Sequence, residues 1–147
     1  MHIGISLAHF SASQAAFYAI KFANKLFKTE HDCTLFYRDL MPHCMEIQAG
    51  CLTLSEIFGF KGTLITTSLY DTEFAIKAVG EGKRIFYVWD LEFLRNEKNF
   101  KKHLTIFRNP GILLAARSQS HSDAIENYCN RKPDMIVKDF NFECEIQ

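Results

Sequence analysis

The segment IGISLAHFSASQAAFYAIKFANKLFKTEHDCTLFY, residues 3–37, decides the fold that we predict for this chain. It opens with an apolar run at 3–8, which is typical of a buried strand, and Ser11 and Ser13 then offer helix N-caps. One face of the predicted helix carries apolar residues at steps of four, three and four: Ala16, Ile20, Ala23 and Phe27. A second apolar run at 33–37 completes a β-α-β unit, which implies parallel strands joined by a right-handed crossover.

The same alternation of strands and helices returns after residue 62. Four further strands are predicted: 63–69, 84–89, 112–116 and 135–137. Three helices are predicted between them: one capped by Asp71 that carries Phe74, Ala75, Ala78 and Val79, a charged one from about Leu91 to Phe107, and one from Ser118 or Ser120 to about Cys129. Residues 41–62 stay unassigned, because the candidate strand at 51–58 contains Ser55 and Glu56.

This order of elements predicts an α/β, Rossmann-like fold. We expect a mainly parallel sheet of about six strands, with the first strand central and helices on both faces. The chain has 147 residues, 48% of them hydrophobic, which suits a single domain over 1–147 with a full core. Lysine plus arginine equals aspartate plus glutamate, so no overall field attracts nucleic acid or an anionic membrane.

Targeting features and cysteine usage predict a soluble, cytoplasmic protein. The chain begins without a basic segment before its first apolar run, so we expect no signal peptide. No stretch approaches the roughly 20 apolar residues of a membrane span. The cysteines are odd in number and form no CxxC pair, which favours reduced, mostly buried thiols: Cys33, Cys44, Cys51, Cys129 and Cys144.

Polar residues that follow the predicted strands form the candidate site, because ligands of parallel sheets bind at the carboxyl ends of the strands. The candidates are His9, Phe10, Ser11, Ser13, Ser68, Asp71, Trp89, Asp90, Ser118 and His121. Tyr70, Glu92 and Ser120 also follow these strands and are assigned no role. Hydroxyls, a carboxylate, a histidine and an aromatic face suit a sugar or another polyol. We expect His9 and Asp90 to be catalytic, either one taking a proton from an acceptor hydroxyl or Asp90 orienting His9. The other candidates are expected to bind substrate.

Each candidate also has a structural interpretation. Serines and Asp71 at these positions are preferred N-caps, and Trp89 is a common type of core residue. His9 and Asp90 would then be hydrogen-bonded structural groups that anchor their loops. These alternatives remain open at the level of the sequence.

Several other classes of site are not expected. His43, Cys44 and Cys51 match no common zinc spacing. After Gly4 the next glycine is Gly50, so the first strand-helix turn lacks the GxGxxG fingerprint and we predict no nucleotide cofactor. No Gly-x-Ser-x-Gly elbow of an α/β-hydrolase occurs. The basic stretch at 95–108 is most simply a solvated helix face, and the alternative is a weak local contact with phosphate-bearing acceptors, including nucleic acid.

Three passages together resemble the amino-terminal, acceptor-side domain of GT-B glycosyltransferases of the family 4 type. Residues 5–10 resemble the opening strand and its loop, which in the family often ends in a histidine and an aromatic residue. Residues 88–90 resemble the strand that delivers a histidine or aspartate to the acceptor side. Residues 112–118 and 135–143 resemble the strand-serine-helix-strand passage that leads to the second domain. The chain departs from the family at 11–14, which lack its proline and paired glycines, and at 141–143, which only partly match its Asn-Gly-x-Asp.

The resemblance implies an acceptor-side half-domain that acts on a sugar or glycan acceptor. The family's donor-binding domain does not follow in this sequence, so transfer is expected to need a separate donor domain, either a partner chain or a second copy. We therefore expect self-association or a partner. The alternative function is a non-catalytic Rossmann-like binding or scaffold module, since fold alone does not determine activity.

Overall fold

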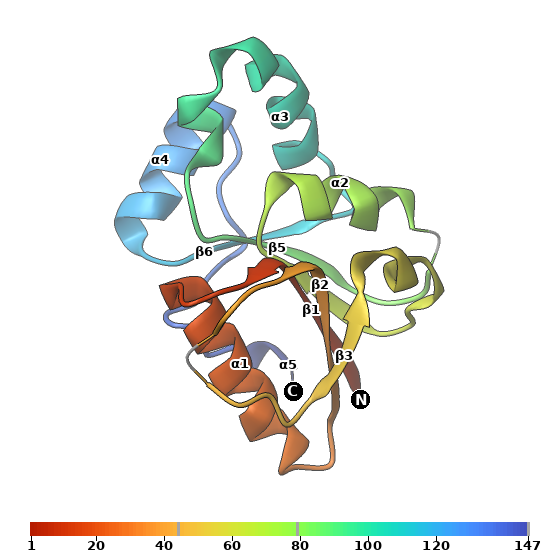
Figure 1. The fold of residues 1–147 in the computed structure, drawn as a ribbon. Coiled ribbons are helices and arrows are strands. Elements are labelled where there is room, and N and C mark those ends of the chain that lie inside the picture. Colours follow the sequence, from red (N-terminus) through yellow and green to blue (C-terminus); the bar gives the residue numbers. More distant parts are fainter. Residues whose placement is uncertain (44, 79, 147) are drawn as a thin grey trace.

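The computed structural model describes residues 1–43, 45–78 and 80–146, and it contains one seven-stranded, all-parallel sheet (Figure 1). The strands lie in the order β3-β2-β1-β4-β5-β6-β7. Their bounds are β1 (His2–Phe10), β2 (Asp32–Leu40), β3 (Gly50–Thr53), β4 (Thr63–Thr66), β5 (Arg84–Val88), β6 (Leu113–Ala116) and β7 (Met135–Ile136). The predicted α/β, Rossmann-like fold is confirmed. β1 lies in the interior of the sheet, beside the middle strand β4.

Helices cover both faces of the sheet. The α-helices are α1 (Gln14–Phe27), α2 (Leu69–Lys77), α3 (Phe100–Phe107), α4 (Gln119–Cys129) and α5 (Glu143–Ile146), and the 3-10 helices are η1 (Leu54–Gly59), η2 (Glu92–Arg95) and η3 (Glu97–Asn99). In Figure 1, α1 and the C-terminal segment lie on one face, and α2, α3 and α4 lie on the other. None of the helices described is long and apolar enough to span a membrane.

Strand β5 shows how the sequence builds the two layers of core. Ile85 and Tyr87 point toward the α1 face, whereas Phe86 and Val88 point toward the face covered by α2, α3 and α4. All four side chains are buried, so each contributes on the order of 1.5–3 kcal/mol to folding. The Tyr87 hydroxyl donates a hydrogen bond to the backbone oxygen of Val137 at 2.6 Å, which ties the segment after β7 to the sheet.

The order of the strands reverses between β1 and β4. The chain first builds outward from β1 to β2 and β3, then crosses back to place β4 on the other side of β1. The helix that follows β1 is α1, which covers one face of the sheet, and the helix that follows β4 is α2, which covers the other face. This switch point is where open parallel sheets leave a crevice at the carboxyl ends of their strands.

Several predicted boundaries were wrong for local reasons. The strand predicted at 63–69 ends at Thr66, because Ser68 instead caps α2 and its Oγ accepts a hydrogen bond from the Asp71 amide at 3.1 Å. Asp71 is therefore a first-turn residue and not the cap. The predicted α1 face is correct at three of its positions, but Phe27 is exposed and Leu26 is buried in its place.

Two other segments also differ from expectation. The helix predicted from Leu91 to Phe107 is divided into η2, η3 and α3, because the Asn96 side chain accepts from the Asn99 amide and starts a new turn. The candidate strand at 51–58 is β3 up to Thr53 and η1 beyond it, where the buried residues are spaced three apart. The predictions made for Cys44 and Val79 lie outside the described residues.

Candidate functional site

A cleft of about 310 Å³ opens at the switch point of the sheet. It is lined by three segments: the end of β1 with the first turn of α1, the turn between β4 and α2, and the loop after β5. Six of the predicted site residues line it: His9, Ser11, Ser13, Ser68, Trp89 and Asp90. Glu92 also lines it, as do Thr67 and Gln14, which were not among the predicted residues. A cavity of this size lies at the small end of ligand pockets.

His9 is held by a carboxylate from the neighbouring strand. The parallel register sets His9 of β1 opposite Asp39 of β2, and the His9 Nδ1 atom lies 3.1 Å from Asp39 Oδ2. A carboxylate beside Nδ1 favours the tautomer with its proton on that nitrogen. The Nε2 atom is then left as an acceptor, which is the state that a general base requires.

Asp90 lies on the same cleft but has a different partner. Its Oδ1 atom is 3.6 Å from Arg95 Nη2, and both side chains are more than half exposed. The orienting contact that we considered for Asp90 toward His9 is made by Asp39 instead. His9 lies in β1 and Asp90 follows β5, and β4 separates these two strands, so the two residues line the cleft from non-adjacent strands.

Glu92 is a second carboxylate on the cleft; it was recognised as following the predicted strand 84–89 but was given no role. Burial raises its pKa above the ordinary 4.5, and the charges of Asp90 and Asp71 raise it further. The backbone of Leu69 and the charge of Arg38 oppose these effects. A carboxylate with a raised pKa is suited to proton transfer nearer neutral pH. Its position two residues beyond Asp90 in the same loop was the available sequence signal.

Asp71 lies beneath the cleft, where it is fully buried. The Ser6 hydroxyl of β1 donates to its Oδ2 at 2.7 Å, and Arg38 Nε of β2 lies 3.3 Å from its Oδ1. Burial raises the pKa of Asp71, against the opposing effects of Ser6, Arg38, Ser68 and His9. Asp71 thus joins β1, β2 and the start of α2, and it does not line the cleft.

Arg38 was also missed from the sequence. Its guanidinium carbon lies 4.3 Å from the centre of the Tyr70 ring, in addition to its ion pair with Asp71. A guanidinium held between a carboxylate and an aromatic ring has few free conformations. Arg38 directly follows the predicted strand at 33–37, so the strand-end rule would have selected it.

Trp89 forms one wall of the cleft as part of the core. It is 8% exposed and packs against Tyr18, Tyr87 and Phe140. The guanidinium carbon of Arg117 lies 4.0 Å from the centre of the Trp89 ring. The core interpretation of Trp89 is therefore confirmed, and a ligand in the cleft would meet only what remains of its surface.

The structure does not bring the other predicted residues into the cleft. Phe10 is 1% exposed and packs against Tyr37 in the core. Ser118 caps α4, where its Oγ accepts from the His121 amide at 3.2 Å. Burial lowers the pKa of His121, as does Arg117, whereas the Val88 backbone and the charge of Asp90 raise it. His121 is thus within electrostatic reach of Asp90 although it does not line the cleft.

Two of the three serines that line the cleft cap helices: Ser13, as the structural interpretation expected, and Ser68, whereas Ser11 is the N-cap of no described helix. Ser13 Oγ accepts from the Ala16 amide at 3.2 Å, and Ser68 caps α2 as described above. Both helices consequently begin at the cleft and direct first-turn amide groups toward it. Such groups carry partial positive charge and can donate to hydroxyl oxygens of a ligand.

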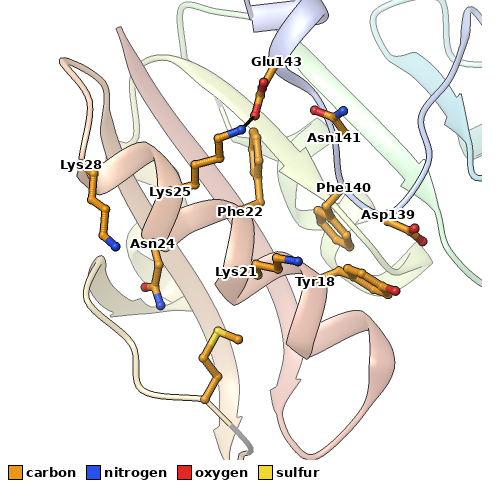
Figure 2. A pocket seen from close by; sticks show the side chains of 11 residues that line it. Tyr18, Lys21, Phe22, Asn24, Lys25, Lys28, Asp139, Phe140, Asn141 and Glu143 are labelled. Carbon is orange, nitrogen blue, oxygen red and sulfur yellow. Dashed lines mark hydrogen bonds and ion pairs between the residues drawn. The ribbon is translucent and has the colours of Figure 1, made fainter.

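A larger cavity, of about 680 Å³, lies along α1 and the C-terminal segment, away from the turns that follow the strands (Figure 2). Three lysines of α1 line it: Lys21, Lys25 and Lys28. Lys25 pairs with Glu143, and Asn24 binds the chain on both sides of residue 47 through Glu46 and Gln48. These contacts hold the C-terminal segment and the loop before β3 against α1.

The basic stretch at 95–108 makes several local contacts. Arg95 pairs with Asp90, Lys102 lies 2.9 Å from Glu73, and Arg108 Nε donates to the backbone of Cys129. Nucleic-acid contact through this stretch stays a prediction. Among the described residues, no group of three or more histidine, cysteine, aspartate or glutamate side chains is placed to hold a metal ion.

Fold and cleft together define a Rossmann-like α/β protein with a polar cavity at the switch point of its sheet. No known protein family, curated protein or solved structure matches the chain. The residues of the cleft are therefore the basis for assigning a function.

Proposed function

We propose that the cleft binds a polyhydroxylated ligand, a sugar or glycan acceptor, and that the chain is the acceptor-side part of a GT-B-like glycosyltransferase. The observation that carries the proposal is the meeting of His9, Trp89 and Asp90 around one cavity at the switch point. Hydroxyl groups need paired donors and acceptors, which the carboxylates, the serines and the helix amides supply. Trp89, which is 8% exposed, closes one wall of the cavity beside these polar groups.

His9 is the proposed general base. Asp39 holds its Nδ1 atom, so Nε2 is available to take a proton from an acceptor hydroxyl. General-base assistance of this type is worth roughly 10²–10⁴-fold in rate. Asp90 is proposed to orient the acceptor. Its carboxylate would accept hydrogen bonds from the hydroxyl groups of the bound sugar.

Donor binding is assigned to a separate domain, from a partner chain or a second copy. Exposed apolar side chains beside the strand ends support such a contact. Leu40 is the last residue of β2 and is 67% exposed, and Met41, directly after it, is 48% exposed. Tyr70 in the first turn of α2 is 47% exposed. Apolar residues gathered at a functional edge often mark a partner surface.

A cytoplasmic location is part of the proposal. Burial, together with the charge of the nearby Cys51, raises the pKa of Cys33 to about 12. Both thiols are free although they lie on adjacent strands. Free neighbouring thiols are typical of a reducing compartment.

The non-catalytic binding module remains a second candidate, and the capping serines favour it. Because Ser13, Ser68 and Ser118 each satisfy a helix amide, their presence needs no ligand. A symmetric dimer that buries the cleft would support this candidate over the transferase.

The test is a titration of the isotopically labelled protein with glucose and with a short glucan, followed by NMR. We expect shifts of the backbone amides of His9, Ser68 and Asp90, with little change at Lys21 in the larger cavity. UDP-glucose, whose pyrophosphate has no basic side chain to meet in the cleft, should bind no more tightly than glucose. Tight binding of UDP-glucose, or shifts confined to the α1 cavity, would contradict the proposal.

A further inference from the structure

The ionisable side chains that line the cleft are mainly acidic. Those that line it are His9, Asp90 and Glu92, and none of the described lining residues is a lysine or an arginine. Three basic side chains approach from outside: Arg95 pairs with Asp90, Arg38 pairs with Asp71, and Arg117 lies over the Trp89 ring. The cavity wall itself therefore presents carboxylates and a histidine to a ligand.

Glu92 differs from the other acidic groups of this region. Asp39, Asp71 and Asp90 each have a cationic or histidine partner. Glu92 takes part in no ion pair within the described part of the chain, and its side chain is partly buried. Its contact with the backbone of Leu69 places the carboxylate at the start of α2, on the wall of the cleft.

The neighbours of Glu92 determine what this carboxylate prefers to bind. Burial together with the like charges of Asp90 and Asp71 raises its pKa, so the ionised form is short of compensating positive charge. A ligand cation beside Glu92 would supply that charge. An anionic ligand would instead meet two carboxylates in a partly desolvated cavity, where charge interactions are weakly screened.

We infer that the cleft selects an amino-bearing polyol, such as an amino sugar, whose ammonium group pairs with Glu92 while its hydroxyls meet His9, Asp90 and the helix amides. This inference rests on the proposed function and specifies its substrate class. The volume of about 310 Å³ suits one sugar ring. The same arrangement selects against sugars that carry a phosphate.

Four sugars that differ in one substituent test the inference by NMR titration: glucosamine, N-acetylglucosamine, glucose and glucose 6-phosphate. The pH is kept where the amine of glucosamine is protonated. We expect glucosamine to bind about fivefold more tightly than glucose, the most that a partly exposed ion pair usually contributes. N-acetylglucosamine, which is uncharged, should lose this advantage, and glucose 6-phosphate should bind more weakly than glucose.

The variant Glu92→Gln removes the charge while its amide oxygen can still accept from Leu69. In this variant glucosamine and glucose should bind equally, whereas Glu126→Gln, on the exposed surface of α4, should keep the preference. If Glu92→Gln does not fold, the comparison of the four sugars on the unsubstituted protein still shows whether the cleft prefers an amino sugar.

Equal binding of glucosamine and glucose, tighter binding of glucose 6-phosphate, or a preference that survives Glu92→Gln would overturn the inference. If glucose still shifts the cleft amides in those cases, the proposed polyol site stands without its amine selectivity. If no sugar shifts them, the proposed function fails as well.

Discussion

The Nδ1 atom of His9 lies 3.1 Å from the Oδ2 atom of Asp39, although the two residues are thirty positions apart. They are brought together by the parallel register of β1 and β2, which pairs His9 with Asp39. The pair places a carboxylate beside the Nδ1 atom of His9 without using either carboxylate that lines the cleft. Of those two carboxylates, Asp90 pairs with Arg95 at 3.6 Å, whereas Glu92 takes part in no ion pair within the described part of the chain.

Replacing Asp39 by alanine should release the His9 ring. We expect the ¹⁵N shifts of its two ring nitrogens to change from one dominant tautomer to a mixture. Because both side chains are about half exposed or more, the free energy of unfolding should fall by less than about 1 kcal/mol. Asp32→Ala, at the other end of β2, should leave the His9 shifts unchanged. Identical His9 shifts in the protein and in Asp39→Ala would show that Asp39 does not set the tautomer.

The stability contribution of Asp71 should depend on pH. Burial raises its pKa above the ordinary 3.8, so the folded protein holds this proton more tightly than the unfolded chain. This contribution is complete below pH 3.8 and is lost as the pH rises through the raised pKa. We therefore expect the unsubstituted protein to gain stability relative to Asp71→Asn as the pH falls from neutral toward 4. Urea unfolding at several pH values measures the difference.

The opposite trend, with Asp71→Asn gaining on the unsubstituted protein at low pH, would mean that Arg38 and Ser6 lower the pKa more than burial raises it. Asp71→Ala removes the acceptor altogether. It should cost about 1–3 kcal/mol at neutral pH, the usual cost of leaving a buried hydroxyl such as Ser6 without its partner.

Replacing Asp90 by asparagine separates function from stability. The side chain is 54% exposed and its partner Arg95 is 73% exposed, so the free energy of unfolding should change by less than about 1 kcal/mol. Sugar transfer by the complete transferase complex should nevertheless be abolished. A loss of about 1–3 kcal/mol with unchanged transfer would instead identify Asp90 as a structural anchor of its loop.

The aromatic anchors of the C-terminal segment should be important for stability. Phe142 is fully buried and packs against Phe22 and Tyr87, so Phe142→Ala should cost about 3–5 kcal/mol. Phe27→Ala offers a matched control, because Phe27 is 58% exposed at the end of α1. Thermal unfolding measures the loss of stability in each of the two variants. Similar losses for the two would show that the C-terminal segment is not anchored as described.

Self-association should depend on the apolar residues at the end of β2. If a second copy covers this edge, light scattering should show a mass that rises with concentration, and the double variant Leu40→Asp with Met41→Asp should remain monomeric. Leu94→Asp, at an exposed position in η2, should associate like the unsubstituted protein. A constant monomer mass for the unsubstituted protein would remove self-association from the proposal.

The sequence by itself determined the layers of the fold. Apolar runs such as 3–8 and 84–89, separated by segments of helical period, require a parallel sheet with helices on both faces. The strand-end rule then selected His9, Trp89 and Asp90, which line one cleft. These predictions succeeded because period and chain order are local properties that tertiary contacts rarely reverse.

Tertiary structure alone decided which polar groups meet. The contacts of His9 with Asp39, of Ser6 with Asp71 and of Arg38 with Asp71 join residues from different elements. They depend on the register between strands and on the position of α2 over the sheet, and no spacing along the chain encodes either. The electrostatic setting of Glu92 has the same origin, because its pKa is raised by burial and by charges that only the folded sheet brings close.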